Sequence, residues 1–237
     1  PAGEVGGSES CLWLNGGIVQ EPIGLWLRLP EQPIVGMAQG CQPVGSPLLI
    51  TSAHGNVIDT LDGKPAFTAF SERAGPLLGD LRRASQAVFL AVPTAAAAAA
   101  AGDRGDDETA WDNGEYYIRG VLALEPSKGA IAASEPLAEG TRIRFAIRSS
   151  YWARQSLRTL VERVRCQLRG KTPRLGLYFC CSGRGHALFG VDNHDIAFIQ
   201  HGLGHFPLAG VFAGGELGPL AGRTRLNLFS GVLAVVP

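Results

Sequence analysis

Two glycine-rich segments near the end of the chain each enclose one charged side chain. One reads Cys181-Ser182-Gly183-Arg184-Gly185, and the other reads Gly214-Gly215-Glu216-Leu217-Gly218-Pro219. Glycine permits positive φ angles and close backbone approach, so such loops expose peptide N–H groups and fix the direction of the enclosed side chain. An arginine and a glutamate that meet at one sheet edge can hold the two ends of a zwitterion, such as an amino acid. The alternative for Arg184 and Glu216 is a structural salt bridge that joins the two loops.

Cys181 stands directly before the first loop and raises the question of nucleophilic catalysis. A reactive cysteine needs a base or a positive environment. The histidines that follow it within 25 residues are His186, His194, His201 and His205. Buried cysteines are commonly inert packing residues. We therefore expect a protein without a catalytic residue, and we keep a Cys181-dependent enzyme as an alternative.

Metal and cofactor motifs are weak or missing in the sequence. His201 and His205 have i, i+4 spacing, but Gly202 and Gly204 weaken a helix between them, and no cysteine or carboxylate spacing completes a zinc pattern. The sequence contains no complete Gly-x-x-x-x-Gly-Lys-Ser/Thr phosphate loop, no dinucleotide fingerprint and no Gly-x-Ser-x-Gly elbow. We expect neither a metal nor a cofactor.

Charge and hydropathy argue against two classes of partner. The 21 basic residues balance the 21 acidic ones, so the chain has no overall attraction to nucleic acid or anionic membranes. No apolar run approaches the roughly 20 residues of a transmembrane helix.

The five cysteines do not suggest a disulfide scaffold. We expect a soluble intracellular protein with reduced thiols, in the cytoplasm or the plastid stroma. The chain begins at Pro1, which fits a removed targeting segment or a cut chain.

The elements that position the two loops follow from periodicity and turn signals. Apolar residues recur at helical spacing over 150–168, with arginines on the other face. The segments after this helix are predicted as a strand over 175–181, a helix over 193–203, a strand over 206–212 and a final strand over 225–236. A helical crossover between strands favours a mixed sheet over a sandwich.

The first half of the chain is predicted to be mostly strands and tight turns. The predicted strands are 12–14 and 18–19 around Asn15-Gly16, 47–52 and 57–61 around His54-Gly55-Asn56, then 86–92, 116–124, 129–133 and 141–147. Pro65 suits the first turn of a helix that Gly75-Pro76 interrupts. The seven alanines at 95–101 lie between Pro93 and Gly102 and have no polar face, so we expect them to belong to a loop insertion.

With these elements placed, the sequence resembles the FIST family, named for F-box and intracellular signal transduction. The segments similar to the FIST C domain are 177–185, 188–190, 193–195, 207–212 and 215–219. Those that resemble the end of a FIST N domain are 40–45, 50–51, 55–58 and 61–66, and 117–119 with 139–148 fit the linking region. The likeness spans most of the chain from about Cys11 onward.

The resemblance implies an α/β (mixed α+β) fold in which mixed β-sheets are flanked by helices in two packed subdomains. It divides the chain into the C-terminal part of a FIST N-like domain (1–92), a low-complexity loop insertion (93–115) and a FIST C-like domain (116–237). Most of a FIST N domain of usual length is expected upstream. The arrangement is similar to stand-alone bacterial and cyanobacterial members, and no F-box is visible.

The resemblance also implies a non-enzymatic sensory module for signal transduction that binds a small, amino-acid-like metabolite between the glycine loops. The expected ligand-binding residues are Cys181, Arg184, Gly185, Asp195, Gly215, Glu216 and Asn227. The alternative is protein–protein interaction as a structural subunit or assembly factor of a larger complex; the alanine-rich insertion suggests a chloroplast protein of a green alga. The sequence departs from the family pattern at Ser149, Asn227 and Ser230, where relatives tend to have Asp, His and Thr. These departures argue against an inherited small-molecule chemistry.

Overall fold

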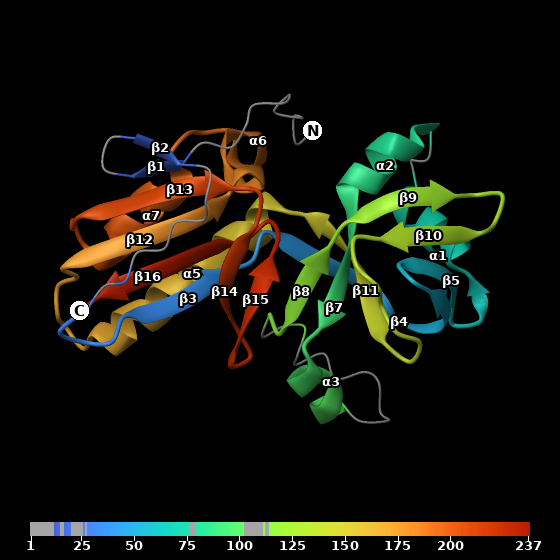
Figure 1. Cartoon of the computed structure of the whole chain (residues 1–237), viewed down its shortest axis with the longest axis horizontal. Helices are drawn as coiled ribbons and strands as arrows, with labels where there is room; N and C mark the ends of the chain where they lie inside the picture. The colour runs from blue at the N-terminus through green and yellow to red at the C-terminus, as the bar shows by residue number, and fades with distance from the viewer. Residues whose placement is uncertain are drawn as a thin grey trace.

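The computed structural model describes residues 12–14, 17–19, 26, 28–75, 79–101, 111 and 114–237. Two subdomains lie next to each other along the longest axis of the molecule (Figure 1). The four-stranded subdomain contains strand β3 and residues 150–237, and the eight-stranded subdomain contains residues 41–148. The mixed α+β fold with two packed subdomains is thus confirmed. Among the described helices, none is long and apolar enough to cross a membrane.

The sheet of the four-stranded subdomain has the order β13-β12-β16-β3. Its strands are β3 (Ile34–Ala38), β12 (Leu175–Cys181), β13 (Leu208–Ala213) and β16 (Gly231–Val236). Strands β12 and β13 are parallel, as the predicted crossover requires, and β16 is antiparallel to both β12 and β3. The crossover consists of the 3₁₀ turn Ser182–Arg184 and the helices α6 (His186–Phe189) and α7 (His194–Leu203). One glycine loop therefore opens the crossover at the carboxyl end of β12.

Helix α5 (Ser150–Leu168) packs on this sheet and confirms the helix predicted over the same residues. The Ser149 side chain accepts a hydrogen bond from the Trp152 N–H and so caps the N-terminus. Arg169 ends the helix in the left-handed conformation. The helix buries one apolar face in a core that it shares with the sheet and α7; the α5 residues of this core are Leu157, Leu160, Val161, Val164 and Leu168.

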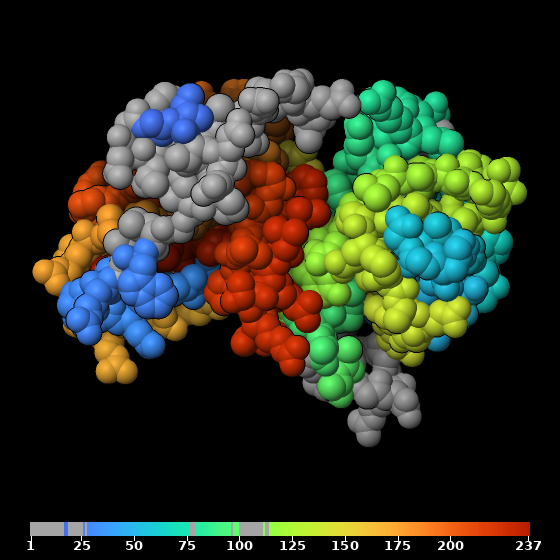
Figure 2. Space-filling model, in the orientation of Figure 1, coloured from blue at the N-terminus to red at the C-terminus, as the bar shows by residue number. Residues whose placement is uncertain are grey.

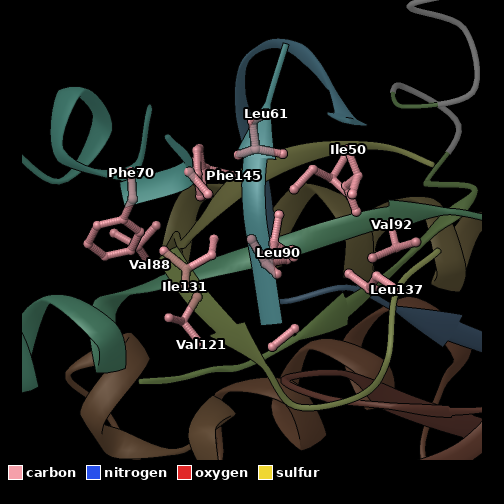
Figure 3. Packing of buried hydrophobic residues seen from close by; sticks show 14 of the residues in the cluster. Ile50, Leu61, Phe70, Val88, Leu90, Val92, Val121, Ile131, Leu137 and Phe145 are labelled. Atoms are coloured by element: carbon pink, nitrogen blue, oxygen red, sulfur yellow. The ribbon is translucent and has the colours of Figure 1, made fainter. Parts of the chain in front are cut away.

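The eight-stranded subdomain is built on the strand order β8-β7-β11-β4-β5-β10-β9, with β6 paired to β5. Its elements are β4 (Cys41–His54), β5 (Val57–Leu61), β6 (Lys64–Pro65), α1 (Ala66–Ala74), α2 (Leu81–Ala87), β7 (Val88–Pro93), α3 (Ala95–Ala101), β8 (Tyr116–Arg119), β9 (Val121–Glu125), β10 (Ala130–Ala133) and β11 (Arg142–Arg148). Figure 3 shows its core, where Phe70 of α1 lies close to Phe145 of β11. Their rings meet edge to face, with centroids 5.8 Å apart.

Three sequence predictions need correction, besides the strand predicted over 116–124, which is the two strands β8 and β9 with different partners, β7 and β10. The segment before Asn56 is one strand of 14 residues, β4, which pairs with β11 and then with β5. The predicted final strand is two strands, because β15 (Arg223–Asn227) forms a hairpin with β14 (Glu216–Leu220), and only then does β16 follow. Glu216 therefore begins a strand and is not in a loop.

The third correction concerns the alanine run, which forms helix α3 where we expected a loop. The Thr94 hydroxyl accepts a hydrogen bond from the Ala97 N–H and caps the helix, and Ala97 is buried. The high helix propensity of alanine, combined with this cap, outweighs the missing polar face. Residues 102–110, 112 and 113 of the expected insertion lie outside the described residues. The division of the chain at residues 92 and 115 stays a prediction.

The β14–β15 hairpin lies where the two subdomains meet. In Figure 2 its residues, coloured red, occupy the centre of the visible face, next to the green and yellow strands of the eight-stranded subdomain. Arg119 of β8 donates a hydrogen bond to the Leu226 carbonyl of β15 at 3.3 Å. Phe229, which follows the hairpin, packs on Phe89 of β7 with ring centroids 4.5 Å apart. The second glycine segment thus leads into the junction. Strands β1 (Leu12–Leu14) and β2 (Gly17–Val19) pair antiparallel, as predicted, and the turn predicted at Asn15-Gly16 lies outside the described residues.

Candidate functional site

Arg184 and Asp195 form a buried ion pair at the carboxyl end of β12. Arg184 is only 1% exposed, and it donates from Nε to Asp195 Oδ2 at 2.9 Å and from Nη2 to Oδ1 at 3.3 Å. Its third nitrogen, Nη1, donates to the Gln39 carbonyl at 3.0 Å. Burial alone would lower the pKa of the guanidinium, but Tyr178 and Asp195 raise it above its ordinary value. All three nitrogens of Arg184 are therefore engaged within the protein.

Asp195 is the centre of this network. It lies in the first turn of α7 and accepts hydrogen bonds from the Tyr178 hydroxyl at 2.7 Å and from the His194 ring at 3.0 Å, in addition to those from Arg184. Burial opposes its ionisation, but the charge of Arg184 and these hydrogen bonds lower its pKa below the ordinary value. The carboxylate is therefore ionised and fully paired.

The tautomer of His194 follows from its two neighbours. Arg154 Nε donates to His194 Nε2 at 3.2 Å, which makes Nε2 the acceptor and Nδ1 the donor toward Asp195. The ring is stacked on Phe189 with centroids 4.0 Å apart and planes 10° apart. Both ring nitrogens of His194 are thus occupied by protein groups.

A pocket of about 260 Å³ lies beside this network, between α6, the start of α7 and the edge strand β13. Its apolar walls are Phe189, Val191, Ile196, Leu208, Val211 and Phe212. Tyr178, Cys180 and the Arg184–Asp195 pair also line it. Small-molecule sites commonly combine apolar walls with a few placed polar groups, and they favour the carboxyl ends of parallel strands.

Cys180 and Cys181 are both buried, and neither is activated. Burial, followed by the nearby Asp195 carboxylate, raises the pKa of the Cys180 thiol to about 12. Burial also raises the pKa of Cys181, and backbone hydrogen bonds at Gly183 oppose this only in part. In the described part of the chain no hydrogen bond joins either sulfur to a histidine. Both cysteines therefore stay protonated near neutral pH.

Glu216 belongs to a second buried polar group, on the junction side of the sheet. Its Oε2 accepts a hydrogen bond from the Ser230 hydroxyl at 2.7 Å, whereas no described residue bonds to its Oε1. Burial raises the pKa of the carboxyl to about 7, although Ser230 lowers it in part. Asn227 faces Glu216 in the hairpin register and donates to the Arg225 carbonyl at 2.9 Å, but its Oδ1 has no partner among the described residues.

The seven predicted site residues thus separate into two groups. Arg184, Gly185 and Asp195 line the pocket beside β13. The other four do not line it; they are Cys181, Gly215, Glu216 and Asn227. The expected pairing of Arg184 with Glu216 is not formed, because Asp195 is close enough to pair with the arginine and Glu216 binds Ser230.

Three residues of the network were missed in the sequence. Tyr178 lies on the same face of β12 as Cys180, and strand alternation from that cysteine could have located it. His194 precedes Asp195 and was considered only as a base for Cys181. Gln39 follows β3, far from the loops in sequence, so no local signal marks it.

A comparison of the sequence with protein-family models identifies two domains. Residues 2–64 match the FIST N domain, and residues 69–219 match the FIST C domain. The chain belongs to the FIST family, whose domains are generally sensory or signal-transduction modules.

Relatives of similar sequence occur in mycobacteria. An uncharacterized protein of Mycobacterium tuberculosis is 36% identical over 211 residues, which covers 88% of this chain and 52% of the relative. An uncharacterized protein of Mycobacterium bovis is 36% identical over 213 residues, with the same coverage. The chain therefore spans about half the length of these relatives.

Proposed function

We propose that this chain is a non-enzymatic ligand-binding module and that the apolar body of a small metabolite occupies the pocket beside β13. The observation that carries the proposal is an open apolar pocket above a polar network whose groups are already paired internally. Asp195 accepts four hydrogen bonds from nitrogen and oxygen donors and a long one from the Cys180 thiol, so a ligand does not have to satisfy a buried charge. Its binding energy then comes from the apolar walls.

The state of the reactive side chains supports a non-enzymatic role. A general base needs a free lone pair near neutral pH, and Arg154 occupies that of His194 Nε2. A cysteine nucleophile needs a depressed pKa, and burial raises the pKa of both Cys180 and Cys181.

The internal hydrogen bonds of Arg184 also limit which class of ligand can bind in this pocket. A carboxylate in this pocket finds no free guanidinium nitrogen, so recognition of a zwitterion by Arg184 and Glu216 is not supported. An amino acid with an apolar side chain still fits the walls, with its polar end at the rim near the exposed Asn193. We therefore propose a ligand defined by its apolar part.

A thermal-shift screen of apolar amino acids and small aromatic metabolites tests this function. We expect at least one compound to raise the melting temperature of the wild type, and we expect Val191→Trp to abolish that rise because Val191 lines the pocket and is 52% exposed. Val35→Trp on β3 is the matched control, because Val35 is also exposed and does not line the pocket. No stabilisation by any compound, or equal stabilisation of Val191→Trp, would contradict the proposal.

A protein partner is the second candidate, and the edge strand β13 favours it. In the described sheet β13 pairs only with β12, and its residues Val211 and Phe212 are 56% and 64% exposed. A strand of another protein can pair with such an exposed edge and place a side chain in the neighbouring apolar pocket. Size-exclusion chromatography of a native extract distinguishes the candidates, because a stable assembly elutes far above the size of one chain.

A further inference from the structure

A second cavity, of about 400 Å³, lies between the two subdomains, and none of the seven residues expected from the sequence lines it. It is bordered by α5, the end of β3, the start of β8 and the end of β14. Its volume lies within the range of small-molecule sites, which are common at domain interfaces. Unlike the pocket beside β13, it is lined largely by polar side chains, among them Gln39, Gln155, Ser156 and Thr159.

Gln39 supplies an unsatisfied acceptor in this cavity. The residue is only 4% exposed, and its Nε2 donates to the Tyr116 carbonyl at 2.9 Å, which fixes the orientation of the amide. Its backbone N–H donates to the Ser156 hydroxyl at 2.8 Å. The Oε1 atom has no partner among the described residues. A buried carbonyl without a donor is costly, so a ligand that donates a hydrogen bond here removes that cost.

Arg163 supplies a guanidinium at the same cavity. It lies on an exposed face of α5, and within the described residues it forms no hydrogen bond or ion pair. A Cβ atom added to Gly36 would lie 2.5 Å from Arg163 Nη2, so the guanidinium lies directly over β3. Glycine at position 36 thus makes room for this arginine. A free guanidinium binds carboxylate or phosphate.

The remaining walls define the body of the ligand. Glu115 adds a carboxylate acceptor, and Thr159 adds a hydroxyl that donates and accepts. Trp152 offers an aromatic ring whose indole N–H is already used, because it donates to the Tyr116 hydroxyl at 3.0 Å. Acceptors and an aromatic ring near the start of α5, with a cation further along the same helix, suit a molecule with hydroxyl donors and one anionic group.

We propose that the cavity between the subdomains binds a small polyhydroxylated anion, a phosphorylated or carboxylated sugar-like compound. Arg163 binds the anionic group, and Gln39 Oε1 and Glu115 accept hydrogen bonds from the hydroxyl groups. The site does not depend on the ligand of the pocket beside β13. The two sites are nevertheless connected, because the carbonyl of Gln39 accepts a hydrogen bond from Arg184.

Isothermal titration calorimetry with four probes tests the proposal. Glucose 6-phosphate and gluconate each carry hydroxyl groups and an anion, glucose lacks the anion, and inorganic phosphate lacks the hydroxyl groups. We expect binding of glucose 6-phosphate, gluconate or both, and which of them binds identifies the anionic group. Glucose and phosphate are expected to bind at least tenfold more weakly, since about 1.4 kcal/mol corresponds to a factor of ten. If neither glucose 6-phosphate nor gluconate binds, the proposal is overturned. It is also overturned if inorganic phosphate binds as tightly as these two probes.

Variants assign any binding to this cavity. Arg163→Met is expected to weaken binding at least tenfold, whereas Arg165→Met, an exposed arginine on the same helix that does not line the cavity, leaves it unchanged. Thr159→Trp fills the cavity from an exposed position and is expected to abolish binding, with Thr159→Ser as its control. Binding that survives Arg163→Met but is lost in Val191→Trp belongs to the other pocket and overturns the proposal.

Discussion

Arg184 and Asp195 show at the residue scale how a buried charge is maintained in this protein. The desolvation of two ions is offset only if their geometry and additional hydrogen bonds are good. Here the carboxylate accepts four hydrogen bonds from nitrogen and oxygen donors, and each guanidinium nitrogen has an acceptor. The pair fixes the first turn of α7 against the loop after β12 and thereby shapes the floor of the pocket.

We predict that Asp195→Asn strongly destabilises the protein, because it leaves the charge of Arg184 buried without a counter-ion. Breaking such a pair costs about 3–5 kcal/mol. For a chain of this size the melting temperature is expected to fall by about 6–20 °C, which thermal denaturation followed by circular dichroism measures.

Asp192→Asn is the matched control, because Asp192 is an exposed carboxylate three residues away. It contacts only the exposed His186, at 3.2 Å, so its effect is expected to stay within about 0.5 kcal/mol. Equal melting temperatures of the two variants would show that the ion pair does not contribute as described.

Glu216 makes the stability of the protein depend on pH. Its pKa in the folded chain is about 7, above the ordinary value of a glutamate, because the carboxyl is buried. Between the ordinary pKa and pH 7 the folded state therefore holds a proton that the unfolded state releases. Stability is then lost as the pH rises through this window, and the loss is complete above about pH 7.

We predict that Glu216→Gln removes this dependence. Relative to the wild type, the variant is expected to gain roughly 2–3 kcal/mol in free energy of unfolding between pH 5 and pH 8. Urea denaturation at both pH values measures the difference. Glu162→Gln on the exposed face of α5 is the control and is expected to follow the wild type. Parallel pH profiles of Glu216→Gln and the wild type would rule out a raised pKa.

Two departures from the family pattern have a structural explanation. Ser149, where the resemblance led us to expect Asp, caps α5, and aspartate is an equally good N-cap residue. Ser230, where it led us to expect Thr, donates its hydroxyl hydrogen to Glu216, and a threonine hydroxyl can donate in the same way. Neither substitution therefore requires the loss of a ligand site. The sequence alone could not assign these roles, because both depend on contacts in the folded chain.

At the scale of elements, periodicity predicted the parts of the fold in which one side chain face is buried. The helix over 150–168, the parallel strands β12 and β13 and the helix between them all agree with the structure. In β12, α5 and α7 buried residues recur at a spacing of two or of three to four, which reflects a local cause, whereas β13 has no buried residue.

Proline and glycine caused the main errors at this scale. Strand β4 contains Pro43 and Pro47, and β14 contains Gly218 and Pro219, so both segments were interpreted wholly or partly as turns. Proline is nevertheless tolerated at irregular positions of strands, and β4 shifts its register twice against β5 and once against β11. The pairing partners of these strands come from distant parts of the sequence, so no local pattern revealed them.

At the scale of the whole molecule, the sites depend on contacts between segments that are far apart in the sequence. Strand β3, from the early part of the chain, completes the C-terminal sheet by pairing with β16. This pairing brings Gln39 next to Arg184 and to the cavity between the subdomains. The sequence predicted that two subdomains pack together, but it could not predict which residues form their interface.

Phe229, together with Leu228, forms an apolar link between the two subdomains. It leaves the four-stranded subdomain between β15 and β16 with a positive φ of 56° and packs on Phe89 of the eight-stranded subdomain. The Arg148 guanidinium lies over its ring at 5.7 Å and donates a hydrogen bond to the Gly183 carbonyl at 2.7 Å. A Cβ atom on Gly183 would lie 2.7 Å from the ring, so this loop of the pocket requires glycine beside Phe229.

We predict that Phe229→Ala uncouples the unfolding of the two subdomains. Loss of the half-buried ring is expected to cost roughly 2–3 kcal/mol, somewhat less than a fully buried phenylalanine. Because each subdomain keeps its own core, the variant is expected to unfold in two steps. In a background in which Trp13, Trp26 and Trp111 are replaced by phenylalanine, tryptophan fluorescence in urea reports on the region of α5 around Trp152, and far-ultraviolet circular dichroism reports on both subdomains. The two signals should coincide for the wild type and for Phe179→Ala, an exposed phenylalanine outside the interface, and should separate for Phe229→Ala. If they stay coincident at an unchanged midpoint, Phe229 does not join the subdomains.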